Sequence, residues 1–199
     1  MSKETTDFIN RNALDVIKSV QGTGLFPSLK MAQMIIESSG KDEKGKFGIG
    51  KGLAVRKANN YFGIKADKNW KGKSVALSTP KDGKAVNLFR VYATALDSLK
   101  DHSIFLLKNS RYKTSGVFTA KTPQAQALAL QKSGYSESSS YGNALIGLIK
   151  AYHLDKLDNG GKGHSVGKSL ALAGGLLVVL STTYYFREEI KTGLQKMIA

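Results

Sequence analysis

Apolar side chains recur every three or four residues over most of the first 155 positions, which is the spacing of amphipathic helices. The first series runs from Phe8 to Val20. A second series begins after Pro27, a residue that the first turn of a helix tolerates, and ends before Gly40. The same spacing predicts further helices that begin at residue 95, run from about 122 to 134, and run from about 139 to 152.

The stretch between residues 61 and 92 has a different pattern. Two short runs, residues 74–79 and 85–92, flank a Pro-Lys-Asp-Gly segment at 80–83. Asp-Gly between two extended runs is a β-hairpin signal. Residues 41–52 are rich in glycine and charge, so we expect a loop there. The pattern therefore predicts a mainly α domain with a small β-hairpin lobe, an α+β arrangement, over residues 1–155.

The chain changes character after residue 155. Residues 156–168 are polar and glycine-rich, which is typical of a linker. Residues 169–186 carry no charge, and as a helix these 18 residues would extend about 27 Å, close to the thickness of a bilayer core. Lys168 and Arg187 can reach the lipid headgroups from its two ends. We expect one C-terminal transmembrane helix at 169–186, with the lipid bilayer as a partner, and a short charged tail at 187–199; the alternative is a buried soluble helix.

Composition narrows the choice of partners and cofactors. The formal net charge of +15 favours polyanions, which include nucleic acids, cell-wall polymers and anionic lipids. The lysines are spread along the chain without an arginine-rich block or a nucleic-acid motif, so we expect no nucleic-acid partner. The chain has no cysteine, and its three histidines lie far apart in sequence. We therefore expect no metal site and no cofactor.

Glu37 is the first candidate for chemistry. It follows Met34, Ile35 and Ile36 at the end of the most apolar predicted helix, where the chain opens into a loop. Contact with apolar neighbours disfavours the charged carboxylate and raises its pKa. A carboxylic acid that stays protonated near neutral pH can donate a proton to a glycosidic oxygen. The alternative is a solvated glutamate at a helix end.

A second carboxylate and a set of sugar-binding side chains would complete a glycosidase site. Asp82 lies in the predicted hairpin turn and could supply the second carboxylate that glycoside hydrolysis commonly needs, or it could serve only the turn. Aromatic rings stack on sugars and amides bond their hydroxyls, although the same side chains also pack protein cores. The residues of these two types that we predict in a binding cleft are Asn59, Asn60, Tyr61, Phe62, Trp70, Tyr135 and Tyr141.

Several ordered motifs together resemble glycoside hydrolase family 73, the glucosaminidases of the flagellar-muramidase and autolysin type. Residues 27–40 are similar to the catalytic helix of that family, and the segment Ala-Asn-Asn-Tyr-Phe-Gly-Ile-Lys at 58–65 resembles its most recognisable motif. The resemblance extends over roughly residues 5–155. The remaining matching segments follow in the family's order, at residues 52–54, 70–75, 89–92, 97–98, 101–102, 110–112, 129–135 and 141.

This resemblance implies a lysozyme-like fold and cleavage of the β-1,4 bond after N-acetylglucosamine in peptidoglycan. It implies Glu37 as the general acid and makes Tyr141 a candidate beside the reacting sugar. Two features depart from the family: the loop at 41–50 is longer, and residues 74–89 lack the glutamate that many members carry. Asp82, the acetamido group of the substrate or another group could take the second role. A lysozyme or lytic transglycosylase, and a non-catalytic wall-binding membrane protein, are the alternatives.

The location of the protein is a further expectation. The polar start of the sequence does not resemble a secretion signal. An enzyme that is anchored by a C-terminal helix and reaches the cell wall without such a signal could be carried in the membrane of a virus. We therefore expect a membrane-anchored protein of a phage virion or of the bacterial envelope.

Overall fold

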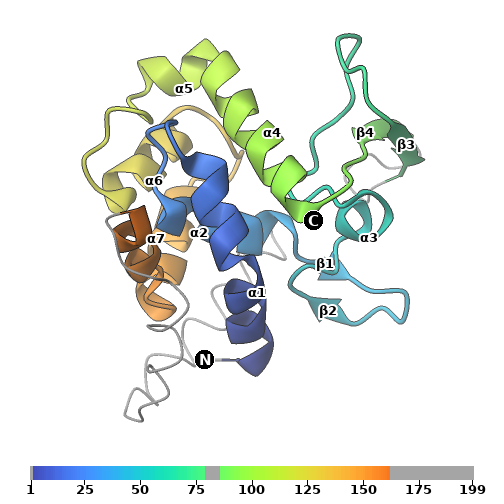
Figure 1. Ribbon diagram of the computed structural model, residues 1–199, viewed down its shortest axis with the longest axis horizontal. Helices are drawn as coiled ribbons and strands as arrows, with labels where there is room; N and C mark the ends of the chain where they lie inside the picture. Colours follow the sequence, from blue (N-terminus) through green and yellow to red (C-terminus); the bar gives the residue numbers. More distant parts are fainter. Residues whose placement is uncertain (1, 79–85, 162–199) are drawn as a thin grey trace.

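The computed structural model describes residues 2–78 and 86–161, in which most helices gather on one side of the molecule and the small β-elements lie with one short helix on the other. Helix α4 runs between the two sides (Figure 1). The helices are α1 (Lys3–Val20), α2 (Pro27–Glu37), α3 (Leu53–Ala58), α4 (Ala95–Lys108), α5 (Ser110–Thr114), α6 (Pro123–Lys132), α7 (Tyr141–Ala151) and the 3₁₀ helix η2 (Leu154–Gly161). The strands are β1 (Gly40–Lys41), β2 (Phe47–Gly48), β3 (Ser74–Leu77) and β4 (Asn87–Arg90).

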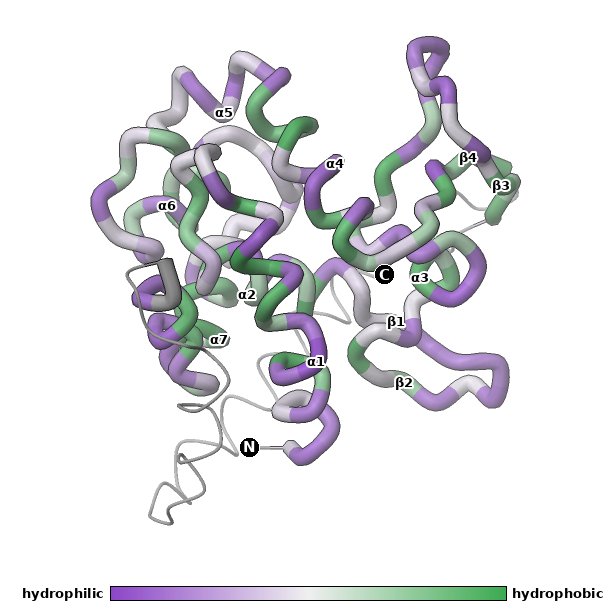
Figure 2. Tube along the Cα trace, in the orientation of Figure 1, coloured by the Kyte–Doolittle hydropathy of each residue, from purple (hydrophilic) through white to green (hydrophobic). Residues whose placement is uncertain are grey.

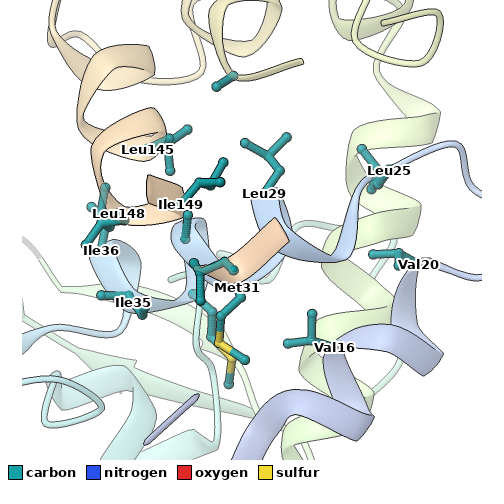
Figure 3. Packing of buried hydrophobic residues seen from close by; sticks show 14 of the residues in the cluster. Val16, Val20, Leu25, Leu29, Met31, Ile35, Ile36, Leu145, Leu148 and Ile149 are labelled. Carbon is teal, nitrogen blue, oxygen red and sulfur yellow. The ribbon is translucent and has the colours of Figure 1, made fainter. Parts of the chain in front are cut away.

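Helix α2 is the most deeply buried element of the described chain. All nine side chains from Ser28 to Ile36 are buried, because α1, α6, α7 and η2 pack around the helix. Figure 3 shows Leu145, Leu148 and Ile149 of α7 directed at the apolar side chains of α2. Full burial of each such side chain contributes about 1.5–3 kcal/mol to folding. This packing fixes the C-terminal end of α2, where Glu37 lies.

A distant carboxylate completes the start of α2. The N-cap residue Phe26 has no side-chain acceptor for the first free N–H groups of the helix. Asp158 of η2 supplies one: its Oδ1 accepts a hydrogen bond from the Ser28 N–H at 2.8 Å and its Oδ2 accepts one from the Ser28 hydroxyl at 2.7 Å. Burial raises the pKa of Asp158, and the two bonds from Ser28 act in the opposite direction.

The fold continues beyond the domain boundary expected from composition. Leu157 is 5% exposed, and η2 packs against α1, α2 and α7. Residues 156–161 therefore belong to the packed fold, although their polar composition is typical of a linker. The rest of the predicted linker, the apolar run at 169–186 and the tail at 187–199 lie outside the described residues. Within residues 2–78 and 86–161, no helix has the length and apolar character needed to cross a membrane.

The exit from α2 is held by a close backbone contact. A side chain on Gly40 would place its Cβ 2.7 Å from the Cα of Gly52. The Gly52 N–H donates to the Ser38 carbonyl at 2.9 Å, and the Gly50 N–H donates to the Ser38 hydroxyl at 3.2 Å. The loop predicted at 41–52 contains the short antiparallel pair β1–β2, with Gly40 opposite Gly48. The first residues after Glu37 are thereby fixed against this small sheet.

The predicted hairpin is present as the antiparallel pair β3–β4. Its register places Ser74 opposite Arg90 and Leu77 opposite Asn87. The strands are shorter than the apolar runs, and the Tyr92 N–H donates instead to the Ala58 carbonyl at the end of α3. Asp82 lies outside the described residues. Figure 2 shows hydrophilic positions along the loop between β1 and β2, in contrast to the hydrophobic positions of α2.

Candidate active site

Glu37 and Tyr141 meet at the C-terminal end of α2. The Tyr141 hydroxyl donates a hydrogen bond to the Glu37 Oε1 at 2.7 Å, although the two residues are 104 positions apart. The Gln33 amide, one turn earlier on α2, donates to the Tyr141 oxygen at 3.3 Å. Tyr141 is fully buried and Glu37 is half-buried. The carboxyl group is therefore held by an internal donor while its residue retains access to solvent.

Close packing of α6 and α7 fixes the position of Tyr141, which is the first residue of α7. The Gly142 N–H donates to the Gln131 side-chain oxygen of α6 at 2.8 Å. A Cβ on Gly142 would lie 3.0 Å from that oxygen and 3.1 Å from the Ala127 carbonyl oxygen. Such a contact is tight enough that a larger residue would push α7, and Tyr141 with it, away from α6.

Two further phenols extend the surroundings of Glu37. The ring of Tyr135 stacks on Tyr141 with centroids 5.4 Å apart, and the ring of Tyr112 lies 6.1 Å from Tyr135. Burial raises the pKa of Tyr135 and of Tyr141 well above the usual value, and the charge of Glu37 raises both further. These phenols therefore stay protonated and can act as hydrogen-bond donors toward the carboxylate.

The side chains of Asn59 and Asn60 form hydrogen bonds to the protein backbone. Asn59 ends α3 in the left-handed region, at φ 50°, and its amide donates to the carbonyls of Tyr92 and Ala93. Asn60 is 1% exposed, donates to the carbonyls of Ile64 and Arg90, and accepts the Ile64 N–H. The whole amide of Asn60 is buried and bonded within the protein, and its sugar-binding role stays a prediction. Both asparagines join α3 to the hairpin side.

The three predicted aromatic ligands between residues 61 and 70 differ in access. Phe62 is 8% exposed and stacks on His102 at a centroid distance of 3.8 Å, so its ring packs in the core, and its sugar-binding role stays a prediction. Tyr61 is partly exposed and packs beside Phe8. Trp70 is partly exposed, its indole N–H donates to the Lys73 carbonyl, and the Arg90 guanidinium lies 4.6 Å from its ring. Tyr61 and Trp70 remain accessible.

A cavity of about 390 Å³ lies between Trp70 and helix α4. Arg90 in its wall forms two bonds to the Asp101 carboxylate, at 2.9 and 3.2 Å. The Tyr92 hydroxyl donates to the same carboxylate at 2.6 Å; burial first, and this bond next, raise the pKa of Tyr92. The Arg90–Asp101 pair has no signal in the sequence alone, because its members come from different elements and carry no spacing signature.

Histidine, aspartate and glutamate side chains are dispersed in the described part of the chain. No group of three or more histidine, aspartate and glutamate side chains lies close enough together there to hold a metal ion. The reactive group that the described residues position is the half-buried carboxyl of Glu37 with its phenolic donor Tyr141. Such a carboxyl can give or take a proton at a bound substrate.

The sequence model of the Glucosaminidase family, described as mannosyl-glycoprotein endo-beta-N-acetylglucosaminidase, matches residues 13–154. The chain belongs to this family. The peptidoglycan hydrolase FlgJ of Salmonella typhimurium is 31% identical over 159 residues, which cover 75% of this chain and 47% of that protein. A probable N-acetylmuramidase of Lactococcus lactis is 28% identical over 197 residues, 92% of this chain and 42% of that protein. The chain spans about half the length of the curated relatives it matches.

Solved structures of the same kind share the fold. The glycoside hydrolase domain of Salmonella typhimurium FlgJ superposes with a TM-score of 0.59 at 29% identity, over 81% of this chain and 96% of that one. The catalytic domain of the autolysin Auto from Listeria monocytogenes superposes with a TM-score of 0.63 at 26% identity, over 79% and 89%. The predicted family and the mainly helical, lysozyme-like fold with small hairpins are confirmed.

Proposed function

We propose that the chain is a peptidoglycan hydrolase that cleaves the β-1,4 bond after N-acetylglucosamine, with Glu37 as the general acid. The bond from Tyr141 to Glu37, at the end of the most buried helix of a glucosaminidase fold, is the observation that carries this proposal. The names of the FlgJ relatives support peptidoglycan as the substrate. Among the predicted ligands, Tyr61 and Trp70 are partly exposed aromatic side chains that would contact the glycan strand.

In this reaction Glu37 gives its proton to the glycosidic oxygen as the bond to the anomeric carbon breaks. Water then adds to that carbon and gives a proton to the Glu37 carboxylate, which restores the acid, and the two sugar ends separate. The Tyr141 hydroxyl holds one carboxyl oxygen of Glu37 throughout, so the proton to be transferred is carried on the other oxygen. Asp82 or the acetamido group of the substrate is proposed to stabilise the positive charge that develops at the anomeric carbon.

The second candidate is cleavage on the other side of N-acetylmuramic acid, as in a lysozyme or a lytic transglycosylase. The observation in its favour is that the Lactococcus lactis relatives are named probable N-acetylmuramidases. The reducing ends of digested peptidoglycan separate the two. New reducing N-acetylglucosamine supports the glucosaminidase, whereas new muramic or anhydromuramic ends would establish the alternative.

Replacement of Glu37 by glutamine tests the role of the acid directly. Glu37→Gln keeps the size and the hydrogen-bonding capacity of the side chain but removes its acidic proton, so we expect turnover to fall by about 10²–10⁴-fold. Release of soluble muropeptides from purified walls measures this rate. Glu43→Gln, on a side chain that is 76% exposed, is the matched control and should keep wild-type turnover. Full activity in Glu37→Gln would exclude Glu37 as the acid.

The location of the enzyme is a separate proposal, based on the sequence of residues 169–186. We propose that this segment anchors the enzyme in a virion membrane or in the bacterial envelope. In the centre of a membrane helix, Val178→Asp and Val179→Asp would each cost about 2.5–3.5 kcal/mol of insertion free energy. The double variant should therefore stay in the supernatant instead of sedimenting with the membrane. Sedimentation of the full chain with phospholipid vesicles measures the effect. Equal pelleting of both proteins would contradict the anchor.

A further inference from the structure

A lysine is enclosed in the core beside the candidate active site. Lys30 lies on α2, two turns before Glu37, and is 1% exposed. Lysine is almost never fully buried unless it is paired with an opposite charge. Among the described residues no carboxylate forms an ion pair with Lys30, and burial lowers its pKa well below the usual value. Burial of the Lys30 amine without a carboxylate partner therefore costs folding free energy.

The contacts of the Lys30 amine are few and specific. Its Nζ lies 2.7 Å from the His102 Nδ1 and 3.5 Å from the Leu99 carbonyl oxygen, both on α4. The same nitrogen lies 5.1 Å from the centre of the Phe62 ring. The Leu99 oxygen can only accept, so an amine N–H is directed to it. Lys30 thus joins α2 to α4 through the imidazole of His102.

His102 continues the chain of contacts toward Glu37. Its ring is 1% exposed and stacks on Phe62, which fixes the plane of the imidazole. The other ring nitrogen, Nε2, lies 2.9 Å from the Tyr135 hydroxyl. If Lys30 donates to Nδ1, the single proton of the neutral imidazole lies on Nε2, and Nε2 donates to the Tyr135 oxygen. The Tyr135 hydroxyl must then direct its own proton away from His102.

Away from His102, Tyr135 faces the candidate active site. Its ring stacks on Tyr141, and Tyr141 donates to the Glu37 carboxylate. Glu37 is also close enough to Tyr135 for its charge to act on the Tyr135 hydroxyl. With the proton of His102 on Nε2, the donors would run in one direction, from the buried amine through the imidazole to the phenols around the carboxyl group.

We propose that Lys30 is a positioning residue of the active site: it sets the tautomer of His102, and His102 in turn directs the Tyr135 hydroxyl toward Tyr141 and Glu37. This inference rests on the proposed role of Glu37. A protein with connected polar side chains in its core is often no more stable than one with apolar side chains of the same volume there. Packing alone would be satisfied by methionine at position 30, so the amine serves orientation.

The tautomer of His102 is measured directly by ¹⁵N NMR of the full chain labelled in its histidines, with His102→Gln used to assign the signal. We expect the proton on Nε2 in the wild type and an altered or mixed tautomer in Lys30→Met. A proton on Nδ1 in the wild type, or an unchanged signal in Lys30→Met, would overturn the proposal. This readout does not require turnover, so it tests the inference even if the proposed hydrolase activity fails.

Kinetics separate positioning from packing. We expect Lys30→Met to lower kcat about tenfold, the size of one lost hydrogen bond, while KM stays within twofold and Tm is unchanged or raised. Ser103→Ala removes another buried group that bonds the same Leu99 carbonyl, and it should leave kcat unchanged. His102→Gln, which keeps a donor near the Nε2 position, should retain more activity than His102→Leu. A wild-type kcat in Lys30→Met, or equal losses in both His102 variants, would overturn the proposal.

Discussion

The two sides of the molecule are built on different principles. Around α2 the side chains are apolar and buried, and residues 2–39 carry four basic and four acidic side chains. On the hairpin side, residues 40–78 carry ten basic and three acidic ones, and large apolar side chains such as Phe47 and Leu88 are exposed. Packing thus positions Glu37, while charge and exposed apolar side chains face the surroundings. In the proposed function, proton transfer and attraction of an anionic polymer would belong to separate regions.

The hairpin side is tied to the helices by charged groups as well as by core residues such as Phe62 and Ile64. Arg90 bonds Asp101 of α4 on one side and reaches Asp67 at 3.4 Å on the other. The Asp67 carboxylate is 58% exposed, and such pairs contribute little and weaken as salt is added. We therefore expect the hairpin side to respond to ionic strength and the α2 side to respond to changes in side-chain volume.

Among the tests of this comparison, loss of the hydrogen bond from Tyr141 to Glu37 should have the largest effect, which is on turnover. Tyr141→Phe removes the hydroxyl that bonds Glu37, and loss of a hydrogen bond to a charged group should lower kcat by about 10- to 100-fold. Tyr152→Phe, on a partly buried tyrosine just after the other end of α7, is the control. Release of muropeptides measures both rates. Equal activity of the two variants would show that the bond from Tyr141 is not needed.

A pair of leucine truncations compares the two sides in stability. Leu145 is fully buried against α2, so Leu145→Ala should lower the free energy of unfolding by about 2–5 kcal/mol. Leu88 is 52% exposed on β4, and Leu88→Ala should change that free energy by less than about 0.5 kcal/mol. Urea unfolding followed by circular dichroism measures both. Similar losses would mean that the hairpin has a core of its own.

The smallest effect should be a dependence of stability on pH that arises from His102, beside Lys30 of α2. Burial, and then the charge of Lys30, lower the pKa of His102 well below 6.5. Below pH 6.5 the unfolded chain therefore binds a proton that the folded chain does not, and the free energy of unfolding falls by up to about 1.4 kcal/mol per pH unit. His102→Gln should lack this part of the slope.

Urea unfolding of both proteins at pH 7.5, 6.5 and 5.5 measures the difference. Asp158, whose pKa is raised, is common to both proteins and cancels in the comparison. Identical slopes would mean that His102 takes up its proton in the folded protein at its ordinary pKa.

The helices and the place of Glu37 could be predicted from the sequence, because long periodic patterns and ordered motifs carry them. Pro27 and the apolar run to Ile36 indicated the helix that ends at Glu37, whereas the role of Glu37 as an acid came from the family resemblance and stays a prediction. Helices α3 and α5 were missed, since six and five residues are too few to show a period. The strands β1 and β2 have two residues each and were missed for the same reason.

The side chains of the site were harder to predict, because the same residue types bind sugars and build cores. Asn60 and Phe62 match a sugar-binding composition, yet their neighbours in space, Arg90 and His102, bury them. The contact between Lys30 and His102 joins residues 72 positions apart and has no signal in a single sequence. What could not be predicted was therefore contact across the core rather than local structure.

The bond between Asp158 and Ser28 also has a consequence for synthesis of the chain. During translation, α2 leaves the ribosome 130 residues before the carboxylate that accepts the N–H of its first turn. The first turn of α2 gains its bond to Asp158 only after η2, the last described helix, has been synthesised. The finished arrangement around Glu37 therefore forms late. A fragment cut after residue 155 would keep every side chain proposed for proton transfer and still lack this closing contact.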